Sequence, residues 1–258
     1  MNQPLYIESI GQGQEIVMLH GWGVNGAVFT PLQPLLSQYR VHYVDLPGFG
    51  HSQTIEGDID TWVDAIASRV TQKAIWIGWS LGGLVASRAA IRYPEQVEGL
   101  VTIASSPCFM AREEQSWPGI PPQVLADFSN QLDRDLGKTI ERFLAIQAMG
   151  STSAKDDIKQ LRELVLSRPL PESAALIQGL DMLKHVDLRP QISQIVQPWL
   201  RIWGRLDGLV PRRVPALMPK DRPQYRDLIF HRASHAPFIS HRDEFITGLN
   251  EWVETFKD

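Results

Sequence analysis

The stretch that decides the fold is Ala74-Ile75-Trp76-Ile77-Gly78-Trp79-Ser80-Leu81-Gly82-Gly83. Its first four residues are apolar and predict a buried strand, and residues 84–92 after it have the amphipathic spacing of a helix. The serine between them fits the G-x-S-x-G pattern, in which a nucleophile stands on a sharp strand-to-helix turn. Glycine permits such a turn where a Cβ atom would clash. Ser80 is therefore the candidate nucleophile. The alternative is a tight turn whose serine caps a helix.

The same alternation of apolar runs and amphipathic stretches extends from this turn in both directions. Short apolar runs predict buried strands at residues 15–19, 41–44, 74–78, 99–104, 199–203 and 225–230. Helical spacing is found at residues 62–70, 84–93 and, at the end of the chain, near 243–256. Buried strands separated by helices indicate a parallel sheet that is covered on both faces. The sequence therefore predicts an α/β fold with a mostly parallel, doubly wound sheet.

Residues 111–185 interrupt this pattern because they contain no convincing strand. Apolar residues recur there at helical spacing in about four segments, which proline and glycine separate at 117–119 and 169–171. We therefore expect a helical insertion at 111–185 in a core formed by residues 1–110 and 186–258.

The composition restricts the class of protein. The chain has 258 residues, of which 43% are hydrophobic and 21% charged, an ordinary balance for a folded domain with a substantial core. No run approaches the roughly 18 apolar residues of a membrane-spanning helix, and the first residues lack the pattern of a secretory signal. A net charge of −4 argues against a nucleic-acid-binding protein. The single cysteine, Cys108, excludes an internal disulfide, so we expect a cytoplasmic protein.

A serine nucleophile needs a general base, and the base needs an acid that orients it. After a turn of this type, the acid and then the histidine follow the serine in the chain. Asp207 directly follows the strand at 199–203, although an aspartate in a turn also bonds its own backbone. Three late histidines compete for the role of base. His231 ends a strand and is expected to face the sheet, and His241 lies near the start of the last helix. His235 lies in the loop between them, and we select it.

An oxyanion hole needs two backbone N–H donors beside the nucleophile. One belongs to the residue after the serine, Leu81, and the other to a loop that follows an earlier strand. His20-Gly21-Trp22-Gly23 follows the strand at 15–19, which makes the Trp22 N–H the second candidate. The alternative is a strand-ending turn with Trp22 as a wall residue. Serine, histidine and aspartate suffice for acyl transfer, so we expect no metal and no organic cofactor.

With these residues in place, the sequence resembles the α/β-hydrolase family. The resemblance rests on His20-Gly21-Trp22-Gly23, Asp45-Leu46-Pro47-Gly48-Phe49-Gly50-His51-Ser52, the turn at Ser80, Asp207 and His235. It covers the chain apart from residues 111–185, which look like the cap, or lid, that many members carry. The resemblance implies the α/β-hydrolase fold with an inserted helical cap.

Within this family, the chain is similar to the esterases of biotin synthesis, which remove a methyl group from the distal carboxylate of pimeloyl-acyl-carrier protein. Segments outside the catalytic motifs also carry this likeness, at residues 104–109, 117–120, 141–145 and 149–150. The resemblance implies a serine carboxylesterase. It also implies substrate contacts at Trp22, Ser80, Leu81, Phe143, Leu144, Ala145, Ile146, Gln147 and His235.

The same resemblance implies that the substrate arrives on an acyl carrier protein. It places the carrier contacts at Lys138, Arg142, Lys155 and Lys159. A carrier of this kind is acidic, so a basic face suits it. Each pair of cations is spaced i,i+4 and lies on one helix face. The alternative is a solvated helix face, because Glu141 and other acids lie close by. We expect no nucleic-acid or membrane partner, and a monomer.

Other functions stay open at the level of sequence. A general short-chain carboxylesterase or a carbon–carbon bond hydrolase would use the same three residues. The non-enzyme alternative is a binding protein with this fold that has lost turnover, although such proteins often lack a member of the triad. One methylene is worth only about 1–3 kcal/mol of discrimination in an apolar pocket, so the sequence does not fix a chain length.

Overall fold

The computed structural model describes residues 4–132, 134–149 and 153–255. The strands found there are β1 (Ile7–Ile10), β2 (Gln14–Leu19), β3 (Tyr39–Val44), β4 (Ala74–Trp79), β5 (Val97–Ile103), β6 (Trp199–Gly204) and β7 (Tyr225–Phe230). The α-helices are α1 (Ile59–Ala67), α2 (Leu81–Arg92), α3 (Pro122–Leu132), α4 (Leu136–Ala148), α5 (Ala154–Leu166), α6 (Ser173–His185), α7 (Val214–Leu217), α8 (Pro237–Ser240) and α9 (Arg242–Glu254). Shorter 3₁₀ segments are η1 (Gly26–Leu36), η2 (Glu113–Gln115) and η3 (Ile192–Gln194).

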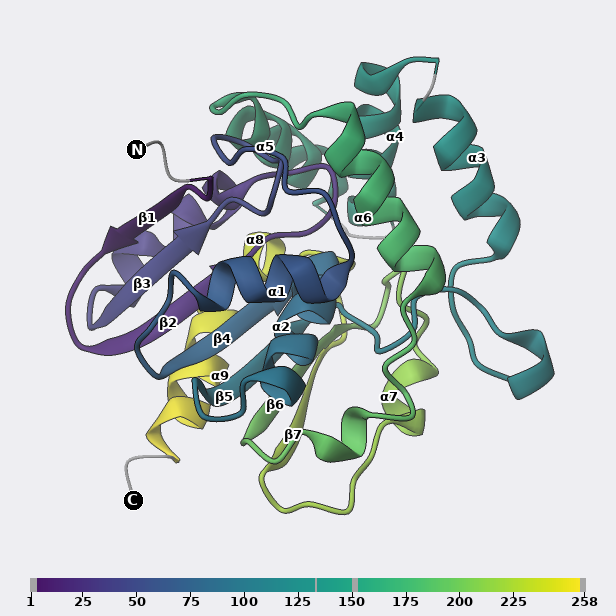
Figure 1. The fold of residues 1–258 in the computed structure, drawn as a ribbon. Coiled ribbons are helices and arrows are strands. Elements are labelled where there is room, and N and C mark those ends of the chain that lie inside the picture. The colour runs from purple at the N-terminus through teal and green to yellow at the C-terminus, as the bar shows by residue number, and fades with distance from the viewer. Residues whose placement is uncertain (1–3, 133, 150–152, 256–258) are drawn as a thin grey trace.

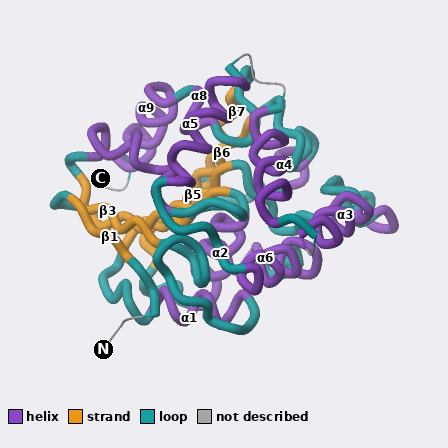
Figure 2. The backbone as a smooth tube through the Cα atoms, turned by 90° about the horizontal axis from the view of Figure 1, so that it is seen from above, coloured by secondary structure: helices purple, strands orange, loops and turns teal. Residues whose placement is uncertain are grey.

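Within the described ranges, the strands form one sheet in the order β1-β3-β2-β4-β5-β6-β7. Every neighbouring pair is parallel except β1 and β3, which are antiparallel. Seen from above, α1 and α2 lie on one side of the sheet and α9 lies on the other (Figure 2). The predicted α/β fold with a mostly parallel, doubly wound sheet is therefore confirmed.

Strand β4, at the centre of the sheet, is buried along its whole length because helices cover both faces. All six residues of β4 are buried, as the continuous apolar run in the sequence predicts. Helix α1 begins after Asp58, whose side chain accepts a hydrogen bond from the Thr61 N–H at 3.0 Å. Its buried residues fall at helical spacing on the face that packs against the core, at Ile59, Trp62, Val63 and Ile66.

Two elements near the N-terminus were not expected from the sequence. Strand β1 is half-exposed at the edge of the sheet, and its Ile-Glu-Ser-Ile sequence is too short and too polar to give a strand signal. It forms because it pairs with β3 in register, from Ile7 opposite Val44 to Ile10 opposite Val41. The 3₁₀ segment η1 contains Pro31 and Pro34, which lack the N–H groups that a regular α-helix requires. Gly150 and Phe256, which the sequence analysis included in predicted segments, lie outside the described residues.

The cap helices, as we call α3 to α6, lie between β5 and β6 in the sequence and gather at one end of the sheet (Figure 1). They pack on one another, α4 against α5 and α3 against α6. They also contact the core, since α5 packs on η1 and α6 on α2.

A buried arginine joins the last two strands of the sheet. Arg201 on β6 is 1% exposed, and its guanidinium donates two hydrogen bonds to the carboxylate of Asp227 on β7, both at 2.9 Å. A third donor reaches the carbonyl of Pro219 at 2.7 Å. The guanidinium also lies over the rings of Trp199 and Tyr225. Arg201 therefore stabilises the pairing of β6 with the edge strand β7.

Replacing Asp227 with alanine removes the partner of this buried guanidinium. We expect Asp227→Ala to lower the free energy of unfolding by about 2–4 kcal/mol. Asp221→Ala, at an exposed position before the strand, is the matched control and is expected to change it by less than about 0.5 kcal/mol. Urea denaturation followed by circular dichroism measures both. Equal stability of the two variants would contradict the structural role of the Arg201 pair.

Candidate active site

The candidate nucleophile, Ser80, lies between the end of β4 and the start of α2. Its backbone has φ 55° and ψ −119°, and a residue with a side chain rarely adopts a positive φ. Hydrogen bonds to the neighbouring strand and the loop after it help to hold this conformation. The Ser80 N–H donates to the carbonyl of Ile103 at 2.9 Å, and the Ser80 carbonyl accepts the hydroxyl of Ser105 at 2.8 Å. The sharp turn predicted from the sequence is present.

Glycine is required on both sides of Ser80 because other backbone segments pass too close for a side chain. A Cβ atom on Gly78 would lie 2.2 Å from the carbonyl oxygen of Gly82. A Cβ atom on Gly82 would lie 2.2 Å from the carbonyl oxygen of Leu19 at the end of β2. The G-x-S-x-G pattern therefore packs the turn directly against the strand that precedes the loop of Trp22.

The structure brings Asp207 and His235 together from the ends of two neighbouring strands. Asp207 follows β6, and its Oδ1 accepts the backbone N–H groups of Leu209 and Val210 at 2.8 and 3.0 Å. Its Oδ2 lies 2.8 Å from Nδ1 of His235. The side chains are 1% and 0% exposed. Since Oδ2 can only accept, Nδ1 carries the proton and Nε2 is the basic nitrogen.

Within the described residues, Nε2 of His235 is buried and has no hydrogen-bond partner, so Ser80 and His235 are not hydrogen-bonded to each other. Such contacts often tighten only when substrate binds. The serine turn and the histidine loop are nevertheless joined, because the indole N–H of Trp79 donates to the carbonyl of His235 at 2.7 Å. Nε2 is therefore available to accept a proton.

The other late histidines lie elsewhere. His231 follows β7 and is exposed instead of facing the sheet, because its position is already beyond the end of the strand; its Nδ1 lies 3.3 Å from a nitrogen of Arg205. Nδ1 of His241 lies 2.8 Å from the hydroxyl of Ser240 at the start of α9. Among the described residues, Asp207 contacts the ring of His235 and not that of His231 or His241.

The two candidate oxyanion donors are the backbone N–H groups of Trp22 and Leu81. Leu81 directly follows the serine at the start of α2. A Cβ atom on Gly21 would lie 3.2 Å from Cβ of Ser80, so the loop of Trp22 lies against the nucleophile. Within the described part of the chain, neither amide has a hydrogen-bond acceptor. Both are thus available to an oxyanion at the start of a helix, where negative charge is favoured.

The side chain of Trp22 reaches from the core into the cap helices. Its indole N–H donates to the carbonyl of Leu176 on α6 at 2.8 Å. Its ring contacts those of Phe143 and Phe128, with centroids 4.7 and 6.3 Å away. Trp22 is completely buried. The ring of Trp22 thus forms an apolar wall beside the candidate oxyanion hole, and its backbone N–H is one of the two candidate donors.

The predicted contact stretch 143–147 does not face inward as a whole. Phe143, Leu144 and Gln147 are buried, whereas Ala145 is exposed and Ile146 is half-buried. A helix turns once every 3.6 residues, so five consecutive side chains cannot share one face. The backbone carbonyl of Gln147 accepts the N–H of His235 at 3.0 Å, and its buried side-chain amide has no partner among the described residues. Gln147 therefore offers an unused polar group next to the histidine loop.

His20 joins the loop of Trp22 to the neighbouring loop after β3. Its Nε2 accepts the N–H of Leu46 at 2.9 Å, and its Nδ1 therefore donates to the carbonyl of Gly21 at 2.7 Å. Burial, which penalises the charged form, lowers the pKa of His20 from 6.5 to about 4. Its imidazole is therefore neutral at pH 7 and has a structural function.

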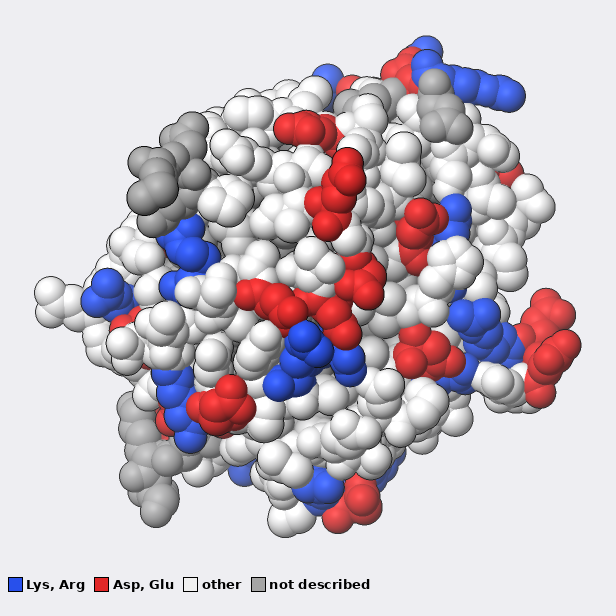
Figure 3. Space-filling view, in the orientation of Figure 1, with Lys and Arg blue, Asp and Glu red and all other residues white. Residues whose placement is uncertain are grey.

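The predicted carrier contacts come from two cap helices and are all exposed. On α4, Lys138 forms an ion pair with Asp135 at 2.9 Å, and Arg142 donates to Gln131 and lies over the ring of Phe128. Lys155 and Lys159 lie on α5. Figure 3 shows basic and acidic side chains side by side over the junction of α3 and α4. The basic face is therefore mixed with acids.

The stretch 201–242 is also rich in arginine, but these side chains do not all lie on one surface. Arg201 is buried, as described above. Arg205, Arg212 and Arg213 instead line a groove of about 460 Å³ beside β7 and α7, which also contains the exposed Leu217 and Ile229.

The remaining expectations concern cysteine, metals and membranes. Cys108 is buried, and burial raises the pKa of its thiol, which favours the unreactive protonated form. Among the described residues there is no cluster of three or more His, Cys, Asp or Glu side chains suited to a metal ion. No helix in the described ranges combines the length and the apolar character needed to span a bilayer.

Sequence reasoning missed Asn25 and Arg168, which tie the cap helices to the loops of the site. The side chain of Asn25 donates to the carbonyl of Val165 at 2.9 Å, and that of Arg168 donates to Asp45 at 2.9 Å. These partners are 140 and 123 positions apart in the chain. No pattern of neighbouring residues predicts contacts over such separations, so they are found only in the folded structure.

Comparison with known proteins shows what this chain is similar to along most of its length. Residues 15–242 match the family described as alpha/beta hydrolase fold. A protein from Shewanella woodyi named pimeloyl-acyl-carrier-protein methyl ester esterase is 71% identical over 256 residues, which cover 99% of this chain and 100% of that protein. A protein of the same name from Shewanella oneidensis is 65% identical over 257 residues, covering 100% of this chain and 97% of that protein. The structure of an esterase from Exiguobacterium antarcticum superimposes with a TM-score of 0.86 at 24% identity, covering 97% of this chain and 95% of that one, and shows the same fold.

The low pKa of His20 gives a pH-dependent stability. Between about pH 4 and pH 6.5, the unfolded chain binds a proton at this residue and the folded chain does not. The free energy of unfolding therefore falls as the pH falls through this window. The loss amounts to roughly 3 kcal/mol at pH 4. We expect His20→Gln to remove this part of the pH dependence. Urea denaturation at several pH values measures it, and His185→Gln, at an exposed histidine, is expected to retain the wild-type slope. An unchanged slope in His20→Gln would contradict the assignment.

Proposed function

The chain belongs to the alpha/beta-hydrolase family, and from this premise we propose that it is a serine carboxylesterase that hydrolyses the methyl ester of pimeloyl-acyl-carrier protein. The products are pimeloyl-acyl-carrier protein and methanol, as a step of biotin synthesis. The observation that carries this proposal is the identity with esterases of that name along the whole chain. The paired Asp207 and His235 beside the serine turn supply a geometry that suits ester hydrolysis.

In the first step, Ser80 Oγ attacks the carbonyl carbon of the methyl ester, and Nε2 of His235 takes the hydroxyl proton. Asp207 keeps the proton of the imidazole on Nδ1 and stabilises the imidazolium that forms. The N–H groups of Trp22 and Leu81 donate to the oxyanion. When the carbon–oxygen bond to the methoxy group breaks, the His235 imidazolium donates its Nε2 proton to the methoxy oxygen. Methanol then leaves, and the acyl group stays bound to Ser80 Oγ.

In the second step, His235 takes a proton from water, and the resulting hydroxide attacks the acyl carbon. The bond to Ser80 Oγ then breaks, and His235 returns the proton to the serine. The free carboxylate of the pimeloyl chain is the product. These steps balance without a metal or an organic cofactor, so the proposal includes neither.

The cap is proposed to select the substrate. We assign residues 111–185 to it and residues 1–110 and 186–258 to the core. The buried rings of Trp22, Phe143 and Phe128 form an apolar surface suited to a methylene chain. The free side-chain amide of Gln147 suits a polar group of the substrate, because a buried amide gains most from a hydrogen bond when it has none.

The exposed cations on α4 and α5, Lys138, Arg142, Lys155 and Lys159, are the proposed docking face for the acidic carrier. Lys138 already has an acidic partner in Asp135, whereas no ion pair holds Lys155 or Lys159 within the described residues. The α5 pair is therefore the more available for a partner. A carrier-linked substrate and a buried, unpaired Cys108 both suit a cytoplasmic enzyme, and we propose that it acts as a monomer.

Hydrolysis of pimeloyl-carrier methyl ester, beside a short nitrophenyl ester, tests the proposed function. We expect wild type to cleave the carrier ester with a much higher kcat/KM than the short ester. Ser80→Ala is expected to lower kcat on both by a factor of about 10⁴ or more. Ser9→Ala, at an exposed serine on β1, is the matched control and is expected to retain wild-type rates.

The pattern of rates separates the alternatives. Cleavage of the short ester alone would support a general short-chain esterase and reject the carrier-linked substrate. Turnover retained in Ser80→Ala would reject Ser80 as the nucleophile. Cleavage of neither ester by wild type would support a binding protein without turnover.

Charge reversal on α5 tests the docking face. We expect Lys155→Glu combined with Lys159→Glu to raise KM for the carrier ester by about 10- to 100-fold, because like charges would then oppose the acidic carrier. The short ester needs no docking, so its kinetics serve as the internal control. Arg212→Glu combined with Arg213→Glu changes the charge equally in the groove beside α7. An equal rise of KM in both double variants would contradict a docking face centred on the cap.

A further inference from the structure

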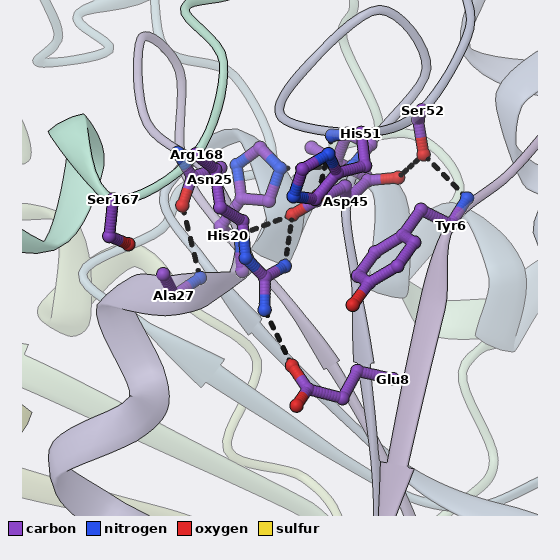
Figure 4. Close-up of polar contacts among 12 residues, drawn as sticks. Tyr6, Glu8, His20, Asn25, Ala27, Asp45, His51, Ser52, Ser167 and Arg168 are labelled. Carbon is purple, nitrogen blue, oxygen red and sulfur yellow. Dashed lines mark hydrogen bonds and ion pairs between the residues drawn. The ribbon is translucent and has the colours of Figure 1, made fainter.

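A fully buried carboxylate lies behind the loop that carries the candidate oxyanion donor Trp22. We call this loop, which runs from residue 20 after β2 to residue 26 at the start of η1, the oxyanion loop. Asp45, at the end of β3, is 0% exposed, and its Oδ1 accepts the N–H of Gly26 at 2.7 Å. Its Oδ2 accepts the N–H of His51 at 2.9 Å. The far end of the oxyanion loop is thus fixed to a buried negative charge (Figure 4).

The positive charge that compensates Asp45 comes from the cap. Arg168, which lies two residues after the end of α5, donates to Asp45 Oδ1 at 2.9 Å and to Glu8 Oε2 on β1 at 2.6 Å. Its side chain is 9% exposed, and its guanidinium lies over the ring of Tyr6 at 5.1 Å. A buried carboxylate without a paired cation destabilises the folded state by several kcal/mol, so Arg168 is needed to keep Asp45 buried at this position. Figure 4 shows the guanidinium between the two carboxylates.

The near end of the oxyanion loop is held by His20. Leu46, the residue after Asp45, donates its N–H to Nε2 of His20 at 2.9 Å, and Nδ1 of His20 donates to the carbonyl of Gly21 at 2.7 Å. The carbonyl of Gly21 and the N–H of Trp22 belong to the same peptide unit. Since that unit is planar, a hydrogen bond that fixes the carbonyl also fixes the direction of the N–H.

A second contact from α5 reaches the same loop. The side-chain N–H of Asn25 donates to the carbonyl of Val165 at 2.9 Å, and its Oδ1 accepts the N–H of Ala27 at 3.1 Å. The end of α5 therefore touches the oxyanion loop directly through Asn25 and indirectly through Arg168 and Asp45. All these polar atoms belong to buried or partly buried groups, where a geometry with several directional bonds is rigid.

We propose that Arg168 is a positioning residue for the reaction: by pairing with Asp45 it holds the peptide between Gly21 and Trp22 so that the Trp22 N–H points at the oxyanion. This inference rests on the proposed function, which makes that N–H a donor. Arg168 touches no reacting atom. Arg168 therefore affects the stability of the transition state and not the binding of the ester, because the oxyanion forms only in the transition state.

The proposal predicts a specific split between kinetic constants. Loss of a whole oxyanion donor lowers kcat by about 10²–10³-fold, so a misdirected donor is expected to lower it by about 10- to 100-fold. We expect Arg168→Gln to lower kcat on the short nitrophenyl ester by this factor, with KM within about twofold of wild type. The affinity for a trifluoromethyl ketone, which forms a tetrahedral adduct on Ser80, is expected to fall by the same factor as kcat/KM.

Two further variants separate positioning from structural damage. Arg168→Lys keeps the charge and one of the two contacts, so it is expected to restore part of kcat and to fold if Arg168→Gln does not. Arg189→Gln is the matched control, because Arg189 also pairs with a carboxylate, on Asp187, and lies over an aromatic ring, Trp117, but contacts no part of the oxyanion loop. It is expected to retain wild-type kinetics. Circular dichroism at the assay temperature verifies that each variant is folded.

Each outcome decides the inference. A folded Arg168→Gln or Arg168→Lys with unchanged kcat, or with a raised KM and unchanged kcat, overturns it. So does an unchanged affinity for the ketone. The short ester keeps this test independent of carrier docking: if wild type cleaves only that ester, the carrier-linked substrate is rejected while the role of Arg168 is still measured. If wild type cleaves neither ester, the proposed function fails and the inference with it.

Discussion

The backbone of Ser80 is held at φ 55° by the carbonyl of Ile103 and the hydroxyl of Ser105, and the rest of the site is arranged around this strained turn. A conformation of this kind costs about 1–3 kcal/mol and persists only where its surroundings enforce it. The enforcement comes from the centre of the sheet: β4 delivers the serine, β5 supplies Ile103, and Gly82 lies against the end of β2. Because parallel strands end at one edge, the loops after β2, β6 and β7 meet the serine there.

The cap helices are joined to this edge largely through their last carbonyl groups. An α-helix leaves its last four carbonyls without partners inside the helix. At the end of α4, the carbonyl of Gln147 accepts the N–H of His235, and that of Met149 accepts the hydroxyl of Ser234 at 2.8 Å. At the end of α5, the carbonyl of Val165 accepts the amide of Asn25. Carbonyl groups at the ends of the cap helices therefore accept hydrogen bonds from the loops that carry the site.

What the sequence predicts well is local. The apolar runs of β4 and β6, the glycines around Ser80 and the order of Asp207 and His235 all follow from neighbouring residues and the rules of one fold class, and the structure brings Asp207 and His235 to 2.8 Å. What it does not predict depends on distant partners. Strand β1 has no signal of its own and exists through its pairing with β3. Arg168 looks like any surface arginine in the sequence, since nothing nearby indicates a buried carboxylate 123 positions away.

The hydrogen bonds at the ends of α4 and α5 connect the proposed docking face with the loops that carry the site. A neutral hydrogen bond contributes about 0.5–1.5 kcal/mol net, so the few bonds at the ends of α4 and α5 together stabilise the position of the cap by roughly a few kcal/mol. The proposed docking face lies on the outer surface of these same helices, whereas their ends touch Asn25, Ser234 and His235. In the proposed function, a carrier that docks on this face would therefore contact the same helices whose ends meet the oxyanion loop and the histidine loop. Binding energy of the carrier that is used at these two loops would raise kcat and not only lower KM, because only interactions that are stronger in the transition state accelerate the reaction.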